Sequence, residues 1–127
     1  TLLPLSGALL SDQTSASIQA NNLSSDLNGV NILVVDDELD SRSLLTFILT
    51  EQYAKVTAVA SGMEALNVLS QSIPDLLISD IGMPNMDGYT LIQKIRASEK
   101  TKSIPAIAVT AYAGQLNEQQ AIKAGFN

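Results

Sequence analysis

The sequence predicts an α/β domain built on a doubly wound parallel sheet. From Gly29 onward, short apolar runs rich in β-branched residues alternate with segments of helical spacing, and such alternation is typical of βα units. The run Ile32–Val35 is apolar throughout, as expected for a parallel strand that is buried on both faces. Right-handed crossovers through the helices would then place the strands parallel, with helices on both faces of the sheet.

Four strands are expected, each bounded by polar or turn-forming residues. The first is the apolar run just described, and the second is β-branched and alternates. The third begins after Pro74 and the fourth after Pro105. In chain order they cover Asn31–Val35, Lys55–Val59, Asp75–Ser79 and Ala106–Val109, the last ending at Thr110.

Four helices are expected to follow these strands. The first runs from Ser41 to about Gln52, and the second begins at Ser61, because Ser61 and Glu64 have the spacing of a capping box. The third covers Tyr89–Ser98, and Gly125 is the stop signal of the last. The apolar residues at helical spacing that we expect to face the core are Leu44, Leu45, Ile48, Leu49, Leu91, Ile92 and Ile95.

The two ends of the chain differ from its middle. Residues 11–28 carry a mix of Ser, Asn, Gln, Asp and Thr that is typical of a linker. We therefore expect a linker within residues 1–28 and one folded domain at residues 29–127. The first residue is Thr rather than Met, which indicates a piece of a longer protein.

The composition excludes several kinds of site. The chain has no Cys and no His, which removes thiolate nucleophiles, thiol-based zinc sites and the commonest general base. Its 13 acidic and 7 basic residues give a net charge of −6, and no basic cluster indicates nucleic-acid binding. No apolar run is long enough to span a membrane and no signal peptide is evident, so we expect a cytoplasmic location without membrane contact.

Polar side chains follow three of the four predicted strands. Asp36 and Asp37 follow the first, Asp80 follows the third and Thr110 closes the fourth. The carboxyl ends of parallel strands meet at one edge of the sheet, where open α/β folds bind their ligands. Three carboxylates brought together there repel one another unless a divalent cation neutralises them. Oxygen ligands of this kind suit Mg²⁺, which also binds phosphate oxygens.

These side chains can divide the work of phosphoryl transfer. Asp80 stands alone at its strand end beside a turn, so we assign it as the nucleophile that forms an aspartyl phosphate. The pair Asp36 and Asp37 suits the holding of the metal ion. Thr110 adds a hydroxyl that can donate a hydrogen bond to a phosphoryl oxygen.

Three motifs together resemble the receiver domain of two-component response regulators, over residues 29–127. They are Ile32-Leu33-Val34-Val35-Asp36-Asp37-Glu38, Asp80-Ile81-Gly82-Met83-Pro84-Asn85-Met86-Asp87-Gly88 and Val109-Thr110-Ala111. The resemblance implies a five-stranded flavodoxin-like (CheY-like) fold. It implies that a histidine kinase or histidine phosphotransfer domain passes a phosphoryl group from its phosphohistidine to Asp80. It also implies Mg²⁺ held by Asp36, Asp37, Asp80 and the Gly82 carbonyl, with Thr110 as the switch hydroxyl.

The chain departs from the family pattern at its end. A fifth strand with a Lys, and a fifth helix, normally follow the point where this sequence stops at Asn127. We therefore expect four of five strands and an unpaired sheet edge prone to association. At the other end, Thr1–Leu5 resembles the closing strand of a histidine kinase ATP-binding domain, which suggests a hybrid histidine kinase as the parent chain.

Two other functions stay open at this point. A Mg²⁺-dependent phosphohydrolase with an Asp nucleophile would need a second Asp two residues after Asp80, and Gly82 stands there. A pseudo-receiver, acting only as an interaction module, is favoured by the missing Lys and disfavoured by the intact acids. The expected receiver is a signalling module that catalyses its own phosphorylation rather than the turnover of a metabolite.

Overall fold

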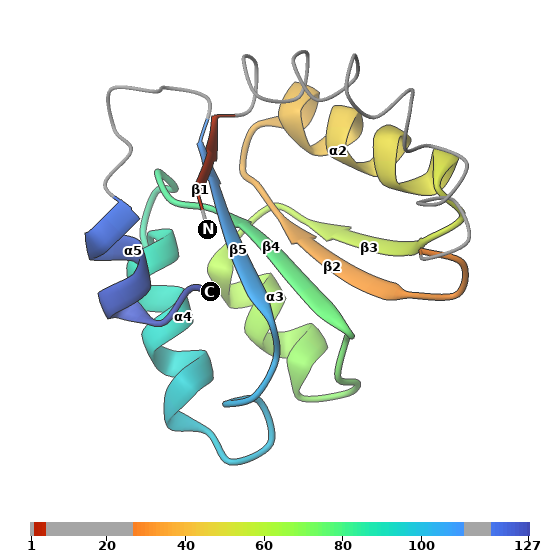
Figure 1. The fold of residues 1–127 in the computed structure, drawn as a ribbon. Coiled ribbons are helices and arrows are strands. Elements are labelled where there is room, and N and C mark those ends of the chain that lie inside the picture. Colours follow the sequence, from red (N-terminus) through yellow and green to blue (C-terminus); the bar gives the residue numbers. More distant parts are fainter. Residues whose placement is uncertain (1, 5–26, 111–117) are drawn as a thin grey trace.

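The structure is a computed structural model that describes residues 2–4, 27–110 and 118–127. Five parallel strands form one sheet in the order β1-β5-β4-β2-β3 (Figure 1). The strands are β1 (Leu2–Pro4), β2 (Asn31–Val35), β3 (Lys55–Val59), β4 (Leu76–Asp80) and β5 (Ala106–Thr110). The helices are α2 (Leu39–Glu51), α3 (Gly62–Leu69), α4 (Gly88–Ala97) and α5 (Glu118–Ala124). No helix within the described residues is long and apolar enough to cross a bilayer.

The four predicted strands and four predicted helices are confirmed, with small shifts at their ends. Asp80 is the last residue of β4 rather than the residue after it. Helix α2 begins at Leu39, two residues earlier than expected. Half of the predicted capping box is present: the Ser61 hydroxyl accepts a hydrogen bond from the Glu64 amide at 3.1 Å, whereas the Glu64 carboxylate accepts from the Ala60 amide at 3.5 Å.

The sheet is covered on both faces, as predicted, and buries two clusters of apolar residues. Helices α3, α4 and α5 pack on one face and α2 on the other (Figure 1). Successive side chains along a strand point to opposite faces of the sheet. Leu33 therefore packs in the larger cluster, and Ile32 packs in the smaller cluster on the other face. The prediction for Leu44 is wrong, because α2 is turned so that Leu45 faces the sheet and Leu44 stays 42% exposed.

The outer edge of β5 is covered, which corrects the expectation of an unpaired edge. Strand β1 runs parallel to β5 with Leu3 opposite Val109. Residues more than one hundred positions apart therefore lie side by side (Figure 1). The sheet therefore has the four predicted strands and one more from the N-terminal segment, and no strand follows β5 in the described part of the chain, as expected.

A single arginine joins the end of α4 to the last residues of the chain. The Arg96 guanidinium donates hydrogen bonds to three main-chain carbonyls, those of Lys102 (2.9 Å), Ile104 (2.6 Å) and Gly125 (2.8 Å). It also donates to the side-chain oxygen of Asn127 at 3.2 Å. Burial lowers the pKa of Arg96, yet these four acceptors satisfy its donors. Arg96 thereby fixes the entry to β5 and the exit from α5.

We predict that Arg96→Met lowers the free energy of unfolding by about 2–4 kcal/mol, because several charge-assisted hydrogen bonds are lost and their acceptors are left partly buried. Urea denaturation measures the change. Lys94→Met on the same helix is the control, since Lys94 is exposed, and it should change stability by less than about 0.5 kcal/mol. Equal losses of stability in the two variants would show that the Arg96 hydrogen bonds do not stabilise the fold.

Gly88 lets the start of α4 approach the end of β4. Its amide donates to the Ile81 carbonyl at 2.8 Å. A Cβ atom at this position would lie 2.5 Å from the Asp80 carbonyl oxygen and 2.8 Å from the Ile81 Cα. These are main-chain atoms of the strand, so they cannot move aside without displacing Asp80.

Gly88→Ala is expected to lower the free energy of unfolding by about 1–3 kcal/mol through overpacking against the main chain. The matched control is Gly62→Ala at the start of α3, where the added Cβ meets the Met86 sulfur at 2.7 Å. Because a methionine side chain is flexible, that variant should lose less stability in the same denaturation experiment. The reverse order would contradict the close approach described for Gly88.

Candidate functional site

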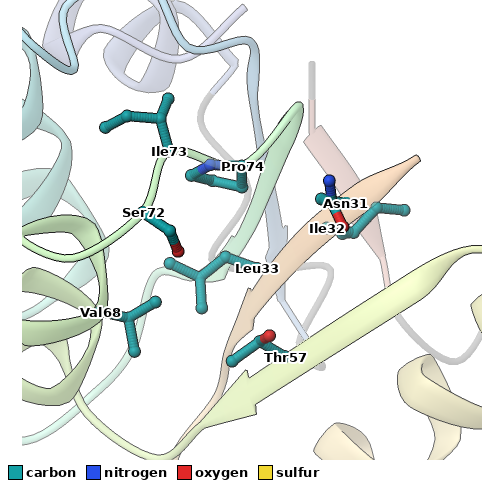
Figure 2. Close-up of a pocket in the computed structure, with 8 residues that line it drawn as sticks. All are labelled: Asn31, Ile32, Leu33, Thr57, Val68, Ser72, Ile73 and Pro74. Atoms are coloured by element: carbon teal, nitrogen blue, oxygen red, sulfur yellow. The ribbon is translucent and has the colours of Figure 1, made fainter. Parts of the chain in front are cut away.

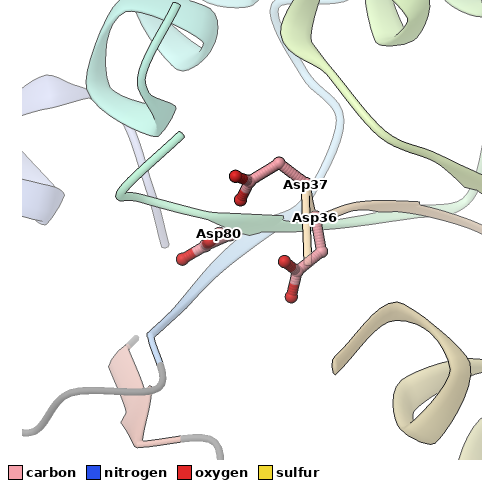
Figure 3. A group of neighbouring side chains, drawn as sticks. All are labelled: Asp36, Asp37 and Asp80. Carbon is pink, nitrogen blue, oxygen red and sulfur yellow. The ribbon is translucent and has the colours of Figure 1, made fainter. Parts of the chain in front are cut away.

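Three carboxylates gather where β2 and β4 end. Asp36 and Asp37 follow β2 directly, and Asp80 closes β4, the neighbouring strand. One carboxylate oxygen from each lies within 4.8 Å of the others (Figure 3). Asp36 is 2% exposed, Asp80 is half-buried and Asp37 is exposed. The structure thus brings together the three predicted acids at the predicted edge.

Asp36 is held by main-chain hydrogen bonds on both of its sides. Its amide donates to the Val59 carbonyl of β3 at 3.1 Å, and its carboxylate accepts from the Glu38 amide at 2.9 Å. The Arg42 guanidinium donates to the Asp36 carbonyl at 2.8 Å. Asp36 therefore has a single orientation, and the start of α2 is attached to it.

Burial and mutual repulsion make these carboxylates hard to ionise together. Burial raises the pKa of Asp36 to about 6, and the charges of Asp80 and Asp37 add to the rise. Burial also raises the pKa of Asp80, with a further contribution from Asp37. Hydrogen bonds from main-chain amides oppose both shifts. Keeping all three carboxylates ionised therefore costs free energy through their mutual repulsion, and a bound cation would lower that free-energy cost.

The group fits a hard divalent cation. Its donors are all carboxylate oxygens, one of them exposed to solvent, which matches the preference of Mg²⁺ for carboxylates together with several waters. Among the described residues the one ion pair joins Lys102 to Glu99, away from this edge. The nearest base, Arg42, donates to a main-chain carbonyl rather than to a carboxylate. The charge of Arg42 lowers the pKa of Asp36, but none of the described side chains forms an ion pair with the three acids.

Asp80 is the acid best placed to react. It lies at the junction between β4 and the loop that precedes α4, and one of its carboxylate oxygens accepts a hydrogen bond from the Gly82 amide at 3.3 Å. The Gly82 carbonyl, which the resemblance assigns as a metal ligand, stays a prediction. Met83, in the loop after Asp80, is 6% exposed and packs in the core.

Thr110 is the last residue of β5, one position after Val109, which pairs with Asp80. Its main chain therefore reaches the same edge as the acids. Its side chain lies outside the described part of the structure, as does Ala111 of the same motif. The hydroxyl role of Thr110 stays a prediction.

A cavity of about 190 Å³ lies at the opposite, amino-terminal edge of the sheet (Figure 2). Its lining is apolar apart from one amide and two hydroxyl side chains, and it holds no titratable group: Asn31, Ile32, Leu33, Thr57, Val68, Ser72, Ile73 and Pro74. The cavity is smaller than most ligand pockets, which measure about 300–1,000 Å³. It carries none of the chemistry of the acidic edge.

Two supporting residues were not foreseen as part of the site. They are Arg42 in the first turn of α2 and Gly88 at the start of α4. Both act through main-chain atoms of the acid-bearing segments. A sequence pattern carries no signal for such contacts, because they depend on how closely a helix approaches the strand ends.

The response regulator receiver domain family matches residues 32–127. An uncharacterized 14.6 kDa protein of Leptolyngbya boryana is 47% identical over 98 residues, which cover 77% of this chain and 75% of that protein. The sensor histidine kinase RcsC of Escherichia coli K12 is 41% identical over 103 residues, or 81% of this chain, but the match spans only 11% of RcsC.

Solved structures of similar fold include a receiver that binds magnesium. The receiver domain of the histidine kinase CKI1 from Arabidopsis thaliana, crystallised with Mg²⁺ and BeF₃⁻, is 30% identical with a TM-score of 0.72, and the match covers 83% of this chain and 82% of that one. Fold, acidic site and family match agree. The chain belongs to the response regulator receiver domain family of two-component signalling.

Proposed function

We propose that Asp80 is the residue of this receiver domain that accepts the phosphoryl group, and that a phosphohistidine of a histidine kinase or phosphotransfer domain supplies it. The observation that carries the proposal is the cluster of Asp36, Asp37 and Asp80, whose carboxylate oxygens lie within 4.8 Å of one another. Asp80 is half-buried at a strand end beside a loop, so an incoming phosphoryl group can reach it.

The chemistry assigned to Asp80 is nucleophilic displacement at phosphorus. A carboxylate oxygen of Asp80 forms a bond to phosphorus while the bond from phosphorus to the imidazole nitrogen breaks, and the imidazole leaves with that electron pair. The Gly82 amide holds one Asp80 oxygen at 3.3 Å.

Asp36, Asp37 and Asp80 are the residues that would hold Mg²⁺, together with the Gly82 carbonyl. When bound, the ion supplies positive charge that offsets the repulsion between the carboxylates and the phosphoryl oxygens. Thr110 is proposed to donate its hydroxyl to a phosphoryl oxygen. The structure of the related CKI1 receiver domain in complex with Mg²⁺ and BeF₃⁻ supports this assignment.

The context proposed for the domain is a hybrid histidine kinase. RcsC and CKI1 are both histidine kinases whose matched regions are receivers in this family. The polar residues 11–28 would then form the linker that precedes the receiver at residues 29–127. The acidic net charge of −6 disfavours nucleic acid as a direct partner.

We predict that Asp80→Asn abolishes labelling of the protein by a small phosphodonor such as acetyl phosphate, because the amide cannot act as the nucleophile. Labelling of the unchanged protein should require Mg²⁺ and stop when EDTA is added. Asp40→Asn is the control: Asp40 is exposed in the first turn of α2, and its loss should leave labelling intact. Persistent labelling of the Asp80 variant, or repeated turnover of phosphate esters, would contradict the proposal.

The raised pKa of Asp36 predicts a pH-dependent effect on stability. Its folded-state pKa of about 6 lies above the ordinary value of about 4, so the native state binds the proton more tightly than the unfolded chain. Asp36 therefore destabilises the metal-free protein at high pH, and this cost disappears as the pH falls from about 6 toward about 4.

Asp36→Asn should accordingly raise the free energy of unfolding of the EDTA-treated protein by about 1–3 kcal/mol at pH 8. The amide oxygen can still accept the Glu38 amide hydrogen bond, so packing is retained. Urea denaturation at several pH values should show the gain shrinking toward pH 4. A gain that does not depend on pH would rule out titration of Asp36 as the cause.

A further inference from the structure

Three polar residues are buried within the described part of the chain, and two of them already have a place in the structure. Asp36 belongs to the acidic edge. The Thr101 hydroxyl donates to the Ile95 carbonyl at 2.6 Å and so satisfies a carbonyl in the last turn of α4. Ser79 is the third, with none of its surface exposed. Burial of a hydroxyl costs free energy unless the hydroxyl is hydrogen-bonded, so Ser79 requires a partner inside the protein.

Ser79 lies in apolar surroundings in the middle of the sheet. Strand β4 runs between β2 and β5 (Figure 1), and Ser79 lies opposite Val35 on one side and Ala108 on the other. Both neighbours belong to the larger apolar cluster, so an apolar side chain would suit this position better than a hydroxyl. The hydroxyl donates to the carbonyl of the next residue, Asp80, at 3.0 Å.

The Asp80 carbonyl lies beyond the part of β4 that pairs with β2. The register of these two strands ends at Val35 opposite Ser79. At the other end of the same peptide unit, the Ile81 amide donates to the Val109 carbonyl at 3.2 Å. A peptide unit is planar, so a hydrogen bond at its carbonyl and another at its amide together fix its orientation. The Ser79 hydroxyl supplies the first of these two hydrogen bonds.

Gly88 approaches the same carbonyl from the start of α4. A Cβ atom at Gly88 would lie 2.5 Å from the Asp80 carbonyl oxygen, so α4 packs directly against this oxygen. The Ser79 hydroxyl and the Gly88 main chain therefore act on one atom, the first through a hydrogen bond and the second through close packing. That atom belongs to the residue whose carboxylate completes the acidic cluster (Figure 3).

We propose that Ser79 is a positioning residue for phosphoryl transfer to Asp80: its hydroxyl fixes the peptide unit that follows Asp80 and thereby the direction in which the Asp80 carboxylate faces the incoming phosphoryl group. The inference rests on the function proposed for Asp80. Ser79 acts through the main chain, since its hydroxyl bonds to the Asp80 carbonyl and not to the carboxylate. A nucleophile held in its reactive orientation before the reaction lowers the barrier to attack.

Ser79→Ala removes the hydroxyl and keeps the carboxylate of Asp80. Labelling by acetyl phosphate in the presence of Mg²⁺ should slow about tenfold, because the nucleophile is no longer held in one orientation. Ser79→Thr keeps a hydroxyl on the same carbon and should recover most of the rate. An unchanged rate in Ser79→Ala would overturn the proposal. Labelling of Ser79→Thr as slow as that of Ser79→Ala would also overturn it, because packing and not the hydroxyl would then set the rate.

Thr101→Val is the matched control. It also removes a buried hydroxyl that donates to a main-chain carbonyl, but this one lies past the end of α4, whereas Gly88 at the start of the helix contacts Asp80. The control should lower stability in urea and leave the labelling rate unchanged. An equal slowing in Thr101→Val would overturn the role of Ser79, because any lost buried hydrogen bond would then have the same effect.

Amide exchange followed by NMR measures the positioning without phosphoryl transfer. In Ser79→Ala the Ile81 amide should exchange about tenfold faster, because its peptide unit has lost one of two hydrogen bonds. The Leu77 amide, which donates to the Pro105 carbonyl at 2.9 Å, should keep its protection. Unchanged exchange at Ile81 would overturn the proposal. Labelling that persists in Asp80→Asn would overturn the function proposed for Asp80 instead, and it would leave this exchange result as it is.

Discussion

Parallel pairing of β2 with β4 is the constraint on which the site depends. Because these neighbouring strands run in the same direction and in register from Ile32 opposite Leu76, their carboxyl ends reach the same edge together. Asp36 directly follows β2 and Asp80 is the last residue of β4. The two carboxylates are therefore brought close together even though they repel each other. The burial of apolar residues on both faces of the sheet offsets the free-energy cost of that repulsion. Burial is the main cause of the raised pKa of Asp36, and repulsion by Asp80 and Asp37 adds to it.

The elements around the site hold the acids in place through the main chain. Arg42 contacts the carbonyl of Asp36, and Gly88 approaches the carbonyl of Asp80. Neither residue alters the carboxylate groups directly. Their effect is to fix where the two strands end, so that the acids stay close enough to share a cation. The first turns of α2 and α4 are thus as much a part of the site as the strands.

Much of the fold and the acidic cluster could be predicted from local pattern. The apolar run before Asp36 predicts a strand, and the turn residues after Asp80 predict a loop, each from only a few neighbouring residues. The face of α2 could not be predicted, because two adjacent apolar pairs define two alternative faces and only packing decides that Leu45 is the buried one. The contacts of Arg96 could not be predicted from the sequence either, because its partners are main-chain carbonyls and any residue can supply one.

The place of β1 in the sheet has a consequence for how the chain folds. Leu2 and its neighbours are synthesised before the other strands of the sheet, yet their partner β5 lies more than one hundred residues later. Closing so long a loop carries an entropic cost that only a finished neighbouring strand can offset. Strand β1 should therefore be the last of the five strands to join the sheet, after β2, β3, β4 and β5 have assembled.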